Sequence, residues 1–316
     1  MKPKILTVGR VHVETAMTLP FIPSAGHTVQ GKSIVRYPGG SGVNTAIALR
    51  KLGADAIVAA RVGSDSNGQR ISHYLSSKDV DTRYLVEDGI FETGSFVRIT
   101  EESGTERSAC FDGANAKLRT EDIEFAMQVC PNGMFVSTDL PDEALIAALT
   151  CGAREHLPTM LDARGDRATA VPFSSLPPVG ILLLDPESAF RYTGVKPGTV
   201  ESSLRCAISL SGMIGADQYV LHLGDRGVFI YDGKYYRVVS TYDQPDGGCI
   251  ATDAYFAVAL LSKYIVSHDM KAAAEFAVLA EAAARGRGGH AANLPSADEL
   301  RRFIDRQKAE KEVRDF

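Results

Sequence analysis

The sequence predicts a doubly wound α/β fold, with a mostly parallel central sheet flanked by helices and a small β-sheet lid. The first observation is that short apolar runs alternate with helical patterns along most of the 316 residues, as a series of βαβ units requires. The second is that residues 11–37 and 93–111 break this alternation with extended, β-branched pieces and turn residues. These two segments are either plain surface hairpins or parts of one small sheet that covers a site.

The periodicity of each segment predicts the elements of the main domain. Apolar runs of strand length predict strands at residues 5–8, 56–60, 134–137, 159–162, 181–184 and 218–223. Apolar residues at helical spacing predict helices at residues 41–52, 68–75, 144–154, 270–285 and 298–312. We therefore expect a large α/β domain of residues 1–10, 38–92 and 112–316, and a small β lid of residues 11–37 and 93–111.

Composition and charge are those of an ordinary globular protein. The chain is 45% hydrophobic and 23% charged, with a net charge of −5. No run of like charges favours nucleic acid or a membrane surface as a partner, and no apolar stretch reaches the ~18 residues of a membrane helix. The five cysteines are scattered without zinc-site spacing. No apolar targeting segment precedes the first strand, so we expect a cytoplasmic protein with reduced thiols.

The first stretch with chemical content is Tyr37-Pro38-Gly39-Gly40-Ser41-Gly42-Val43-Asn44, which leads into a predicted helix. Its glycines let the backbone turn tightly and approach a ligand closely. The helix start offers unpaired N–H groups and the positive end of the helix dipole. Taken alone, the pattern is equally compatible with an ordinary tight turn.

The second stretch, residues 245–256, ends in Ile250-Ala251-Thr252-Asp253 and runs into an apolar helix. The simplest interpretation makes Thr252 or Asp253 the N-cap of that helix. The functional interpretation makes Asp253 the group that accepts a proton from a substrate hydroxyl, while nearby backbone amides stabilise a transferring phosphoryl group.

Together the two stretches resemble the acceptor and catalytic motifs of the ribokinase-like (PfkB) sugar kinases. Residues 39–44 resemble the family's GGKGAN motif, and residues 250–253 stand at its GAGD motif. Residues 61–68, the turn at 112–115, the loop at 223–228 and the tail at 287–295 also match. The resemblance covers nearly the whole chain.

The resemblance implies a kinase that transfers phosphate from ATP, with Mg²⁺, to a hydroxyl of a sugar or nucleoside. Asp253 would be the general base. The implied contacts are an anion hole at Ile250, Ala251 and Thr252, acceptor-binding residues Glu14, Gly39, Gly40, Ser41, Asn44 and Asp139, nucleotide-binding residues Asp185, His222, Gly224 and Gly227, and a metal-binding Glu187. It also implies a lid that covers the sugar and forms a homodimer, and it allows a monovalent cation as a further cofactor.

Several positions depart from the family pattern, mostly on the nucleotide side. β-Branched Ile250 and Thr252 replace the two glycines of the GAGD motif, and such residues tolerate positive φ poorly. Glu187 lies one position early for the metal-organising NxxE motif, and His222 replaces a threonine. On the acceptor side Ser41 replaces the lysine. Asp139 is either a sugar-facing carboxylate or one at a strand end that faces water.

Two functions of different classes follow from this pattern. The retained Asp253 and the turn at residues 39–44 favour a sugar or nucleoside kinase. The departures around the nucleotide favour a sugar-binding or regulatory pseudokinase that has lost normal ATP handling. A Rossmann dehydrogenase is excluded, because no GxGxxG follows the first strand with an acidic residue ~20 positions further on.

Overall fold

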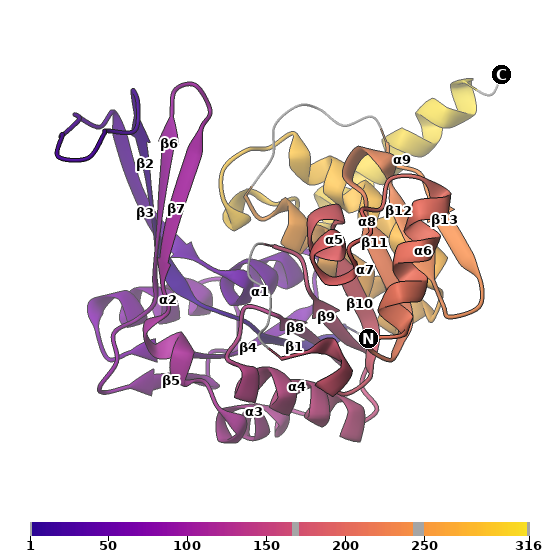
Figure 1. Cartoon of the computed structure of the whole chain (residues 1–316), viewed down its shortest axis with the longest axis horizontal. Helices are drawn as coiled ribbons and strands as arrows, with labels where there is room; N and C mark the ends of the chain where they lie inside the picture. The colour runs from indigo at the N-terminus through magenta and orange to yellow at the C-terminus, as the bar shows by residue number, and fades with distance from the viewer. Residues whose placement is uncertain (1, 166–170, 243–249, 315–316) are drawn as a thin grey trace.

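The computed structural model describes residues 2–165, 171–242 and 250–314. Residues 245–249 of the second motif therefore lie outside the described residues. Within the described part, one sheet has the strand order β13-β12-β11-β10-β9-β8-β1-β4-β5, and a second has the order β3-β2-β6-β7. Figure 1 shows the second sheet extending away from the layered body that contains the first.

The large sheet is mostly parallel, as predicted. Its strands β4, β1, β8, β9, β10 and β11 pair in parallel, β5 joins β4 in parallel, and only β12 and β13 add in antiparallel fashion among the described strands. The bounds are β1 (Lys4–Val8), β4 (Asp55–Gly63), β5 (Leu85–Asp88), β8 (Gly133–Ser137), β9 (Thr159–Asp162), β10 (Val179–Leu184), β11 (Ala216–His222), β12 (Val228–Tyr231) and β13 (Tyr236–Val239).

Helices cover both faces of this sheet, because successive side chains of each buried strand point into opposite cores. Ile5 packs in one core and Leu6 in the other. The first core is completed by α1 (Ser41–Lys51), α2 (Ser66–Ser76), α7 (Thr252–Ser267), α8 (Met270–Arg285) and α9 (Ala297–Arg314). The second is completed by α3 (Thr120–Met127), α4 (Asp142–Arg154), α5 (Pro186–Thr193) and α6 (Val200–Ser211). None of the described helices is long and apolar enough to cross a bilayer.

The two segments that break the alternation pair with each other. Strand β2 (His12–Leu19) pairs antiparallel with β3 (Ser33–Gly39) and parallel with β6 (Ser95–Glu101), which continues into β7 (Glu106–Phe111). The small sheet is therefore confirmed, and two independent hairpins are not what forms. The division of the chain into two domains at the predicted boundaries stays a prediction.

The side chain of Asn115 links the two segments that enter and leave the small sheet. The Nδ2 of Asn115 donates to the Val11 carbonyl at 2.7 Å, and its Oδ1 accepts from the Val11 N–H at 2.9 Å. Asn115 lies in the short 3-10 helix η1 (Gly113–Lys117), directly after β7. The entrance and the exit of the small sheet are thereby fixed to each other.

Candidate active site

The site lies at the carboxyl edge of the parallel sheet. In the strand order β11, β10, β9, β8, β1, the residues at or just after the strand ends are His222, Asp185, Arg164, Asp139 and Arg10. Because parallel strands all end at the same edge, polar residues far apart in sequence form one row there. Ligands of open α/β sheets bind at this edge.

The glycine-rich turn closes the acceptor end of the row. Gly40 has a φ of 99°, and a Cβ added there would overlap the Arg10 carbonyl oxygen. That same oxygen accepts a hydrogen bond from the Gly42 N–H at 2.9 Å. The following helix α1 begins at Ser41, and its Asn44 N–H donates to the Gly40 carbonyl. Gly40 is therefore required by the close approach of the backbone that follows β1.

Ser41 connects this turn to Asp139. Its Oγ accepts from the Arg10 N–H at 3.0 Å and donates to Oδ1 of Asp139 at 3.1 Å. Burial raises the pKa of the Asp139 carboxyl, although the neighbouring Arg10 charge opposes the shift. Asp139 and Arg10 also line a cavity of about 140 Å³ with Asp112 and Asn115. Asp139 is half-buried just after the end of β8, and whether it faces a sugar or water stays a prediction.

Glu14 lies in β2 of the small sheet and is already paired. Nε of Arg98, from β6, donates to Oε1 of Glu14 at 2.7 Å. His12 stacks on Phe96 with ring centroids 5.3 Å apart. Burial, followed by the nearby Arg10 charge, lowers the pKa of His12 to about 4, so its ring is neutral at pH 7. No local pattern singles out Arg98, because its partner lies on a different strand of the small sheet.

Asp253 is the second residue of α7. The N-cap position falls on Ala251, and no side chain caps the helix start, so the interpretation of Thr252 or Asp253 as the cap is wrong. The Asp253 side chain is 76% exposed at the carboxyl edge. The described non-glycine residues with positive φ do not include residues 250–252. Ile250 and Thr252 therefore fit the helix start without backbone strain.

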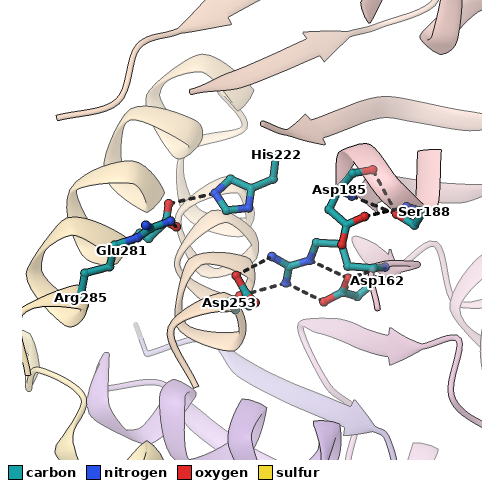
Figure 2. A network of polar contacts seen from close by, with 8 residues as sticks. Asp162, Asp185, Ser188, His222, Asp253, Glu281 and Arg285 are labelled. Carbon is teal, nitrogen blue, oxygen red and sulfur yellow. Dashed lines mark hydrogen bonds and ion pairs between the residues drawn. The ribbon is translucent and has the colours of Figure 1, made fainter. Parts of the chain in front are cut away.

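Arg164 was missed by the sequence analysis, although a charged residue just after a buried strand is a usable signal. Its Nε and Nη2 form two hydrogen bonds with the Asp162 carboxylate, at 2.9 and 2.7 Å. Nη2 also donates to the Asp253 carbonyl at 2.9 Å, and Nη1 lies 3.8 Å from Oδ1 of Asp253. Figure 2 shows Asp162 and Asp253 on opposite sides of this guanidinium group.

His222, at the end of the row opposite Arg10, belongs to a buried network. Its Nε2 lies 2.9 Å from Oε2 of Glu281, whose other oxygen accepts from Nη2 of Arg285 at 2.9 Å (Figure 2). Burial disfavours the charged Glu281, but these two partners outweigh it and lower the pKa of its carboxyl. His222, Asp253 and Glu281 each offer a ligand atom within 4.8 Å of the others. Each Glu281 oxygen accepts one hydrogen bond, so His222, Glu281 and Arg285 form one hydrogen-bonded network.

The remaining nucleotide-side predictions fall on local structure. Asp185 is the N-cap of α5 and accepts from the Ser188 N–H at 2.7 Å (Figure 2). Glu187 is exposed and paired with Lys196. Gly224 opens the short turn η3 (Gly224–Arg226), and Gly227 closes it with a φ of 87°. Whether these residues bind a nucleotide stays a prediction.

These residues fit a protein-held Mg²⁺ poorly. The carboxylates of Asp162, Asp185 and Asp253 act electrostatically on the Arg164 guanidinium, which takes the central position among them. Magnesium bound with few protein ligands keeps water and substrate phosphates around it. An ion at this edge would therefore be held mainly by the phosphates of a bound nucleotide rather than by protein carboxylates alone.

Comparisons with known proteins agree with this geometry. The ribokinase of Staphylococcus aureus is 24% identical over 305 residues, which is 95% of this chain and 99% of the relative. An ATP-dependent ribose-1-phosphate kinase of Halopiger xanaduensis is also 24% identical, over 95% of this chain and 98% of the relative.

Solved structures share the fold. The ribokinase of Giardia lamblia superimposes with a TM-score of 0.84 at 21% identity, over 97% of this chain and 99% of that one. The Arabidopsis thaliana ribokinase, solved with ribose and ATP, has a TM-score of 0.83 at 20% identity, over 96% and 99% of the two chains. The pattern of the pfkB family carbohydrate kinases matches residues 2–297. The chain belongs to the pfkB family of carbohydrate kinases.

Proposed function

We propose that this protein is a kinase that transfers the γ-phosphate of ATP to a hydroxyl of a sugar or nucleoside, with Asp253 as the general base. The observation that carries the proposal is the position of Asp253. Its carboxylate is exposed at the start of α7, without a capping role, beside a buried guanidinium group. A base in this position can accept the hydroxyl proton as the new P–O bond forms.

The acceptor would lie between this carboxylate and the small sheet. Helix α1, which begins at the glycine-rich turn, packs against α7, which begins at Asp253. The turn and the base therefore begin two helices that pack against each other. Glu14 is held by Arg98 and His12 is neutral, so this end of the site suits an uncharged, hydroxyl-rich ligand.

The nucleotide would occupy the end of the row near His222. Asp185, His222, Gly224 and Gly227 lie at or just after β10 and β11, which are neighbours in the sheet. The relatives named for ribokinase activity and the ATP-bound structure support ATP as the donor. When bound, Mg²⁺ would offset charge on the phosphates, and Asp185 and Glu187 are the carboxylates of this chain that would face it.

The test is single-turnover phosphorylation with MgATP across a panel of sugars and nucleosides, for the parent and Asp253→Asn. We expect Asp253→Asn to lower the rate of the chemical step by about 10²–10⁴-fold. Asp298→Asn is the matched control, because Asp298 is also an exposed carboxylate in the first turn of a helix. An Asp253→Asn variant as fast as the parent would contradict the mechanism.

The pseudokinase remains the second candidate because Ile250 stands, 42% exposed, at the helix start where a phosphate would approach. Isothermal titration separates the two functions. Submillimolar binding of MgATP favours the kinase. Binding of a sugar without detectable nucleotide favours the pseudokinase.

We also propose that the small sheet joins two copies of the chain. One face of this sheet leaves the apolar side chains of Ile34, Val97 and Phe111 exposed. An apolar patch of this kind marks an interaction surface. Sedimentation of the parent should give a dimer, and Ile34→Ser/Val97→Ser should shift it toward the monomer. A parent that sediments as a monomer at micromolar concentration would contradict this assembly.

A further inference from the structure

Arg164 is a buried cation with one unused hydrogen-bond donor. Its side chain is 8% exposed, although it lies beside the exposed Asp253. Among the described residues, Nη1 is screened from solvent and has no hydrogen-bond acceptor. The nearest carboxylate oxygen, Oδ1 of Asp253, is 3.8 Å away, which is too long for a hydrogen bond. A desolvated N–H without a partner costs about 1–3 kcal/mol, and a ligand oxygen would remove that cost.

The guanidinium group is fixed rather than mobile. Two hydrogen bonds to Asp162 hold its plane, and a third ties Nη2 to the Asp253 carbonyl. Burial alone would lower the pKa of Arg164, but the charges of Asp162, Asp253 and Asp185 outweigh it and raise the pKa. Arg164 is therefore a permanent positive charge in a set orientation, which is the arrangement that electrostatic catalysis requires.

The start of α7 faces the same place. Its first described intrahelical bond runs from the Tyr255 N–H to the Ala251 carbonyl, so the N–H groups of Asp253 and Ala254 are directed out of the helix end. No side chain caps them. The positive end of the 16-residue helix and the Nη1 of Arg164 thus converge beside the Asp253 carboxylate. An anion at this point would satisfy both.

We propose that Arg164 is a catalytic residue, whose Nη1 donates a hydrogen bond to the phosphoryl group during its transfer from the nucleotide to the acceptor oxygen. The proposal rests on the kinase function proposed above. In the step, the acceptor O–H bond breaks and its proton goes to the Asp253 carboxylate. A bond forms between the acceptor oxygen and the γ-phosphorus, the bond from that phosphorus to the β–γ bridging oxygen breaks, and ADP leaves with the electron pair. Arg164 stays protonated throughout.

This role explains how the start of α7 can bind a phosphoryl group although Ile250 and Thr252 stand where the family motif has glycine. The positive charge comes from a side chain after β9, so it does not depend on glycine at residues 250–252. Arg164 and the three carboxylates around it together carry a net negative charge. The donor therefore has to bring its own divalent cation, and we expect free ATP to bind more weakly than MgATP.

The experiment compares Arg164→Gln and Arg164→Lys with the parent, using MgATP and the best acceptor of the panel. We expect Arg164→Gln to lower kcat by about 10³-fold, the lower end of the effect of an arginine on phosphoryl transfer. The KM of the acceptor should change less than threefold, because the contact forms mainly in the transition state. Arg164→Lys should recover roughly tenfold of the loss, since it keeps the charge without the fork geometry.

A second readout does not depend on turnover. Titration of aluminium fluoride into the protein with MgADP and acceptor measures binding of a planar phosphoryl mimic. We expect Arg164→Gln to weaken this binding by at least 100-fold and to leave the affinity for MgATP within threefold. The matched control is Arg191→Gln, because Arg191 is an exposed arginine that donates to the nearby Gly165 carbonyl from α5.

Removing Arg164 alone leaves Asp162 unpaired, so the folded state of each variant is measured by thermal unfolding. Asp162→Asn/Arg164→Gln removes both charges and should unfold close to the parent while it keeps the loss of kcat. Suppose that the parent phosphorylates an acceptor and that the kcat of Arg164→Gln is within threefold of the parent's. This result would overturn the role of Arg164 and leave the kinase function intact. A parent that binds no MgATP and phosphorylates nothing would overturn the kinase function and this role together.

Discussion

Arg98 and Arg164 each hold a carboxylate at one end of the site, but they differ in what they leave unpaired. Arg98 joins three strands of the small sheet, with Nε on Glu14 at 2.7 Å and Nη1 on Glu106 at 2.6 Å. Arg164 is tied to Asp162 and keeps a buried N–H without an acceptor among the described residues. An arginine whose donors meet protein acceptors stabilises the fold. One that keeps a desolvated donor beside a base is prepared for a ligand.

The largest expected effect on stability is that of replacing Arg98. In Arg98→Met the Glu14 carboxylate, 3% exposed, loses its partner inside the protein. We expect the free energy of unfolding to fall by roughly 2–4 kcal/mol, because a buried charge without a partner is costly. Urea unfolding followed by circular dichroism measures this change. Arg164, by contrast, should affect kcat more than stability.

The control for this prediction removes both charges. Glu14→Gln/Arg98→Met should recover most of the lost stability, because no buried charge is then left unpaired. If the free energy of unfolding of Arg98→Met is within about 0.5 kcal/mol of the parent's, the Arg98 pair contributes no more than a surface ion pair. The distinction between the two arginines would then be lost.

The second prediction concerns pH on the acceptor side. The pKa of His12 is lowered from 6.5 to about 4 in the folded protein. Between these values the unfolded chain binds more protons than the folded one, so stability falls as the pH drops from 6.5 toward 4. At pH 5 the loss assigned to His12 is about 2 kcal/mol.

Unfolding of the parent and His12→Asn at pH 7 and pH 5 isolates this contribution. The variant should lose about 2 kcal/mol less than the parent over this range. His73→Asn is the control, because it makes the same substitution at a histidine that is exposed on α2. If the free energy of unfolding falls by the same amount in the parent and in His12→Asn between pH 7 and pH 5, His12 is accessible to water in the folded state.

The smallest prediction concerns Asp139, which lies between the two ends of the site. Burial raises the pKa of its carboxyl. The contribution of Asp139 to stability is therefore greatest at pH values below the ordinary pKa of an aspartate, and it is lost as the pH rises through the pKa in the folded state. Asp139→Asn removes the buried charge and keeps an oxygen that can accept from Ser41. We expect the variant to be about 1 kcal/mol more stable at pH 7.

Thermal unfolding at pH 7 and pH 3 tests this difference. The melting temperature of Asp139→Asn should exceed that of the parent by about 2 °C at pH 7 and match it at pH 3. The KM of the acceptor should rise, because a charged acceptor of hydroxyl hydrogen bonds is lost. A variant less stable than the parent at pH 7 would show that the charge of Asp139 is favourable in place.

Local patterns in the sequence predicted the elements of the fold well. The helix expected at residues 41–52 is Ser41–Lys51, and the strand expected at 159–162 is Thr159–Asp162. The register of the small sheet was not predictable, because β2 pairs in parallel with a strand more than 80 residues further on. The prediction for the N-cap of α7 was also wrong, because Ala251 occupies that position and no side chain caps the helix.

The sequence by itself determined the fold class, the glycine-rich turn at residues 39–42 and the position of Asp253 at a helix start. Periodicity and turn chemistry are properties of neighbouring residues, so they can be derived from a single chain. Only the tertiary structure decided which charges meet. Glu14 is paired with Arg98 across 84 residues, and the Asp253 carbonyl meets Arg164 across 89. Such contacts follow from strand order and helix packing, which no local pattern specifies.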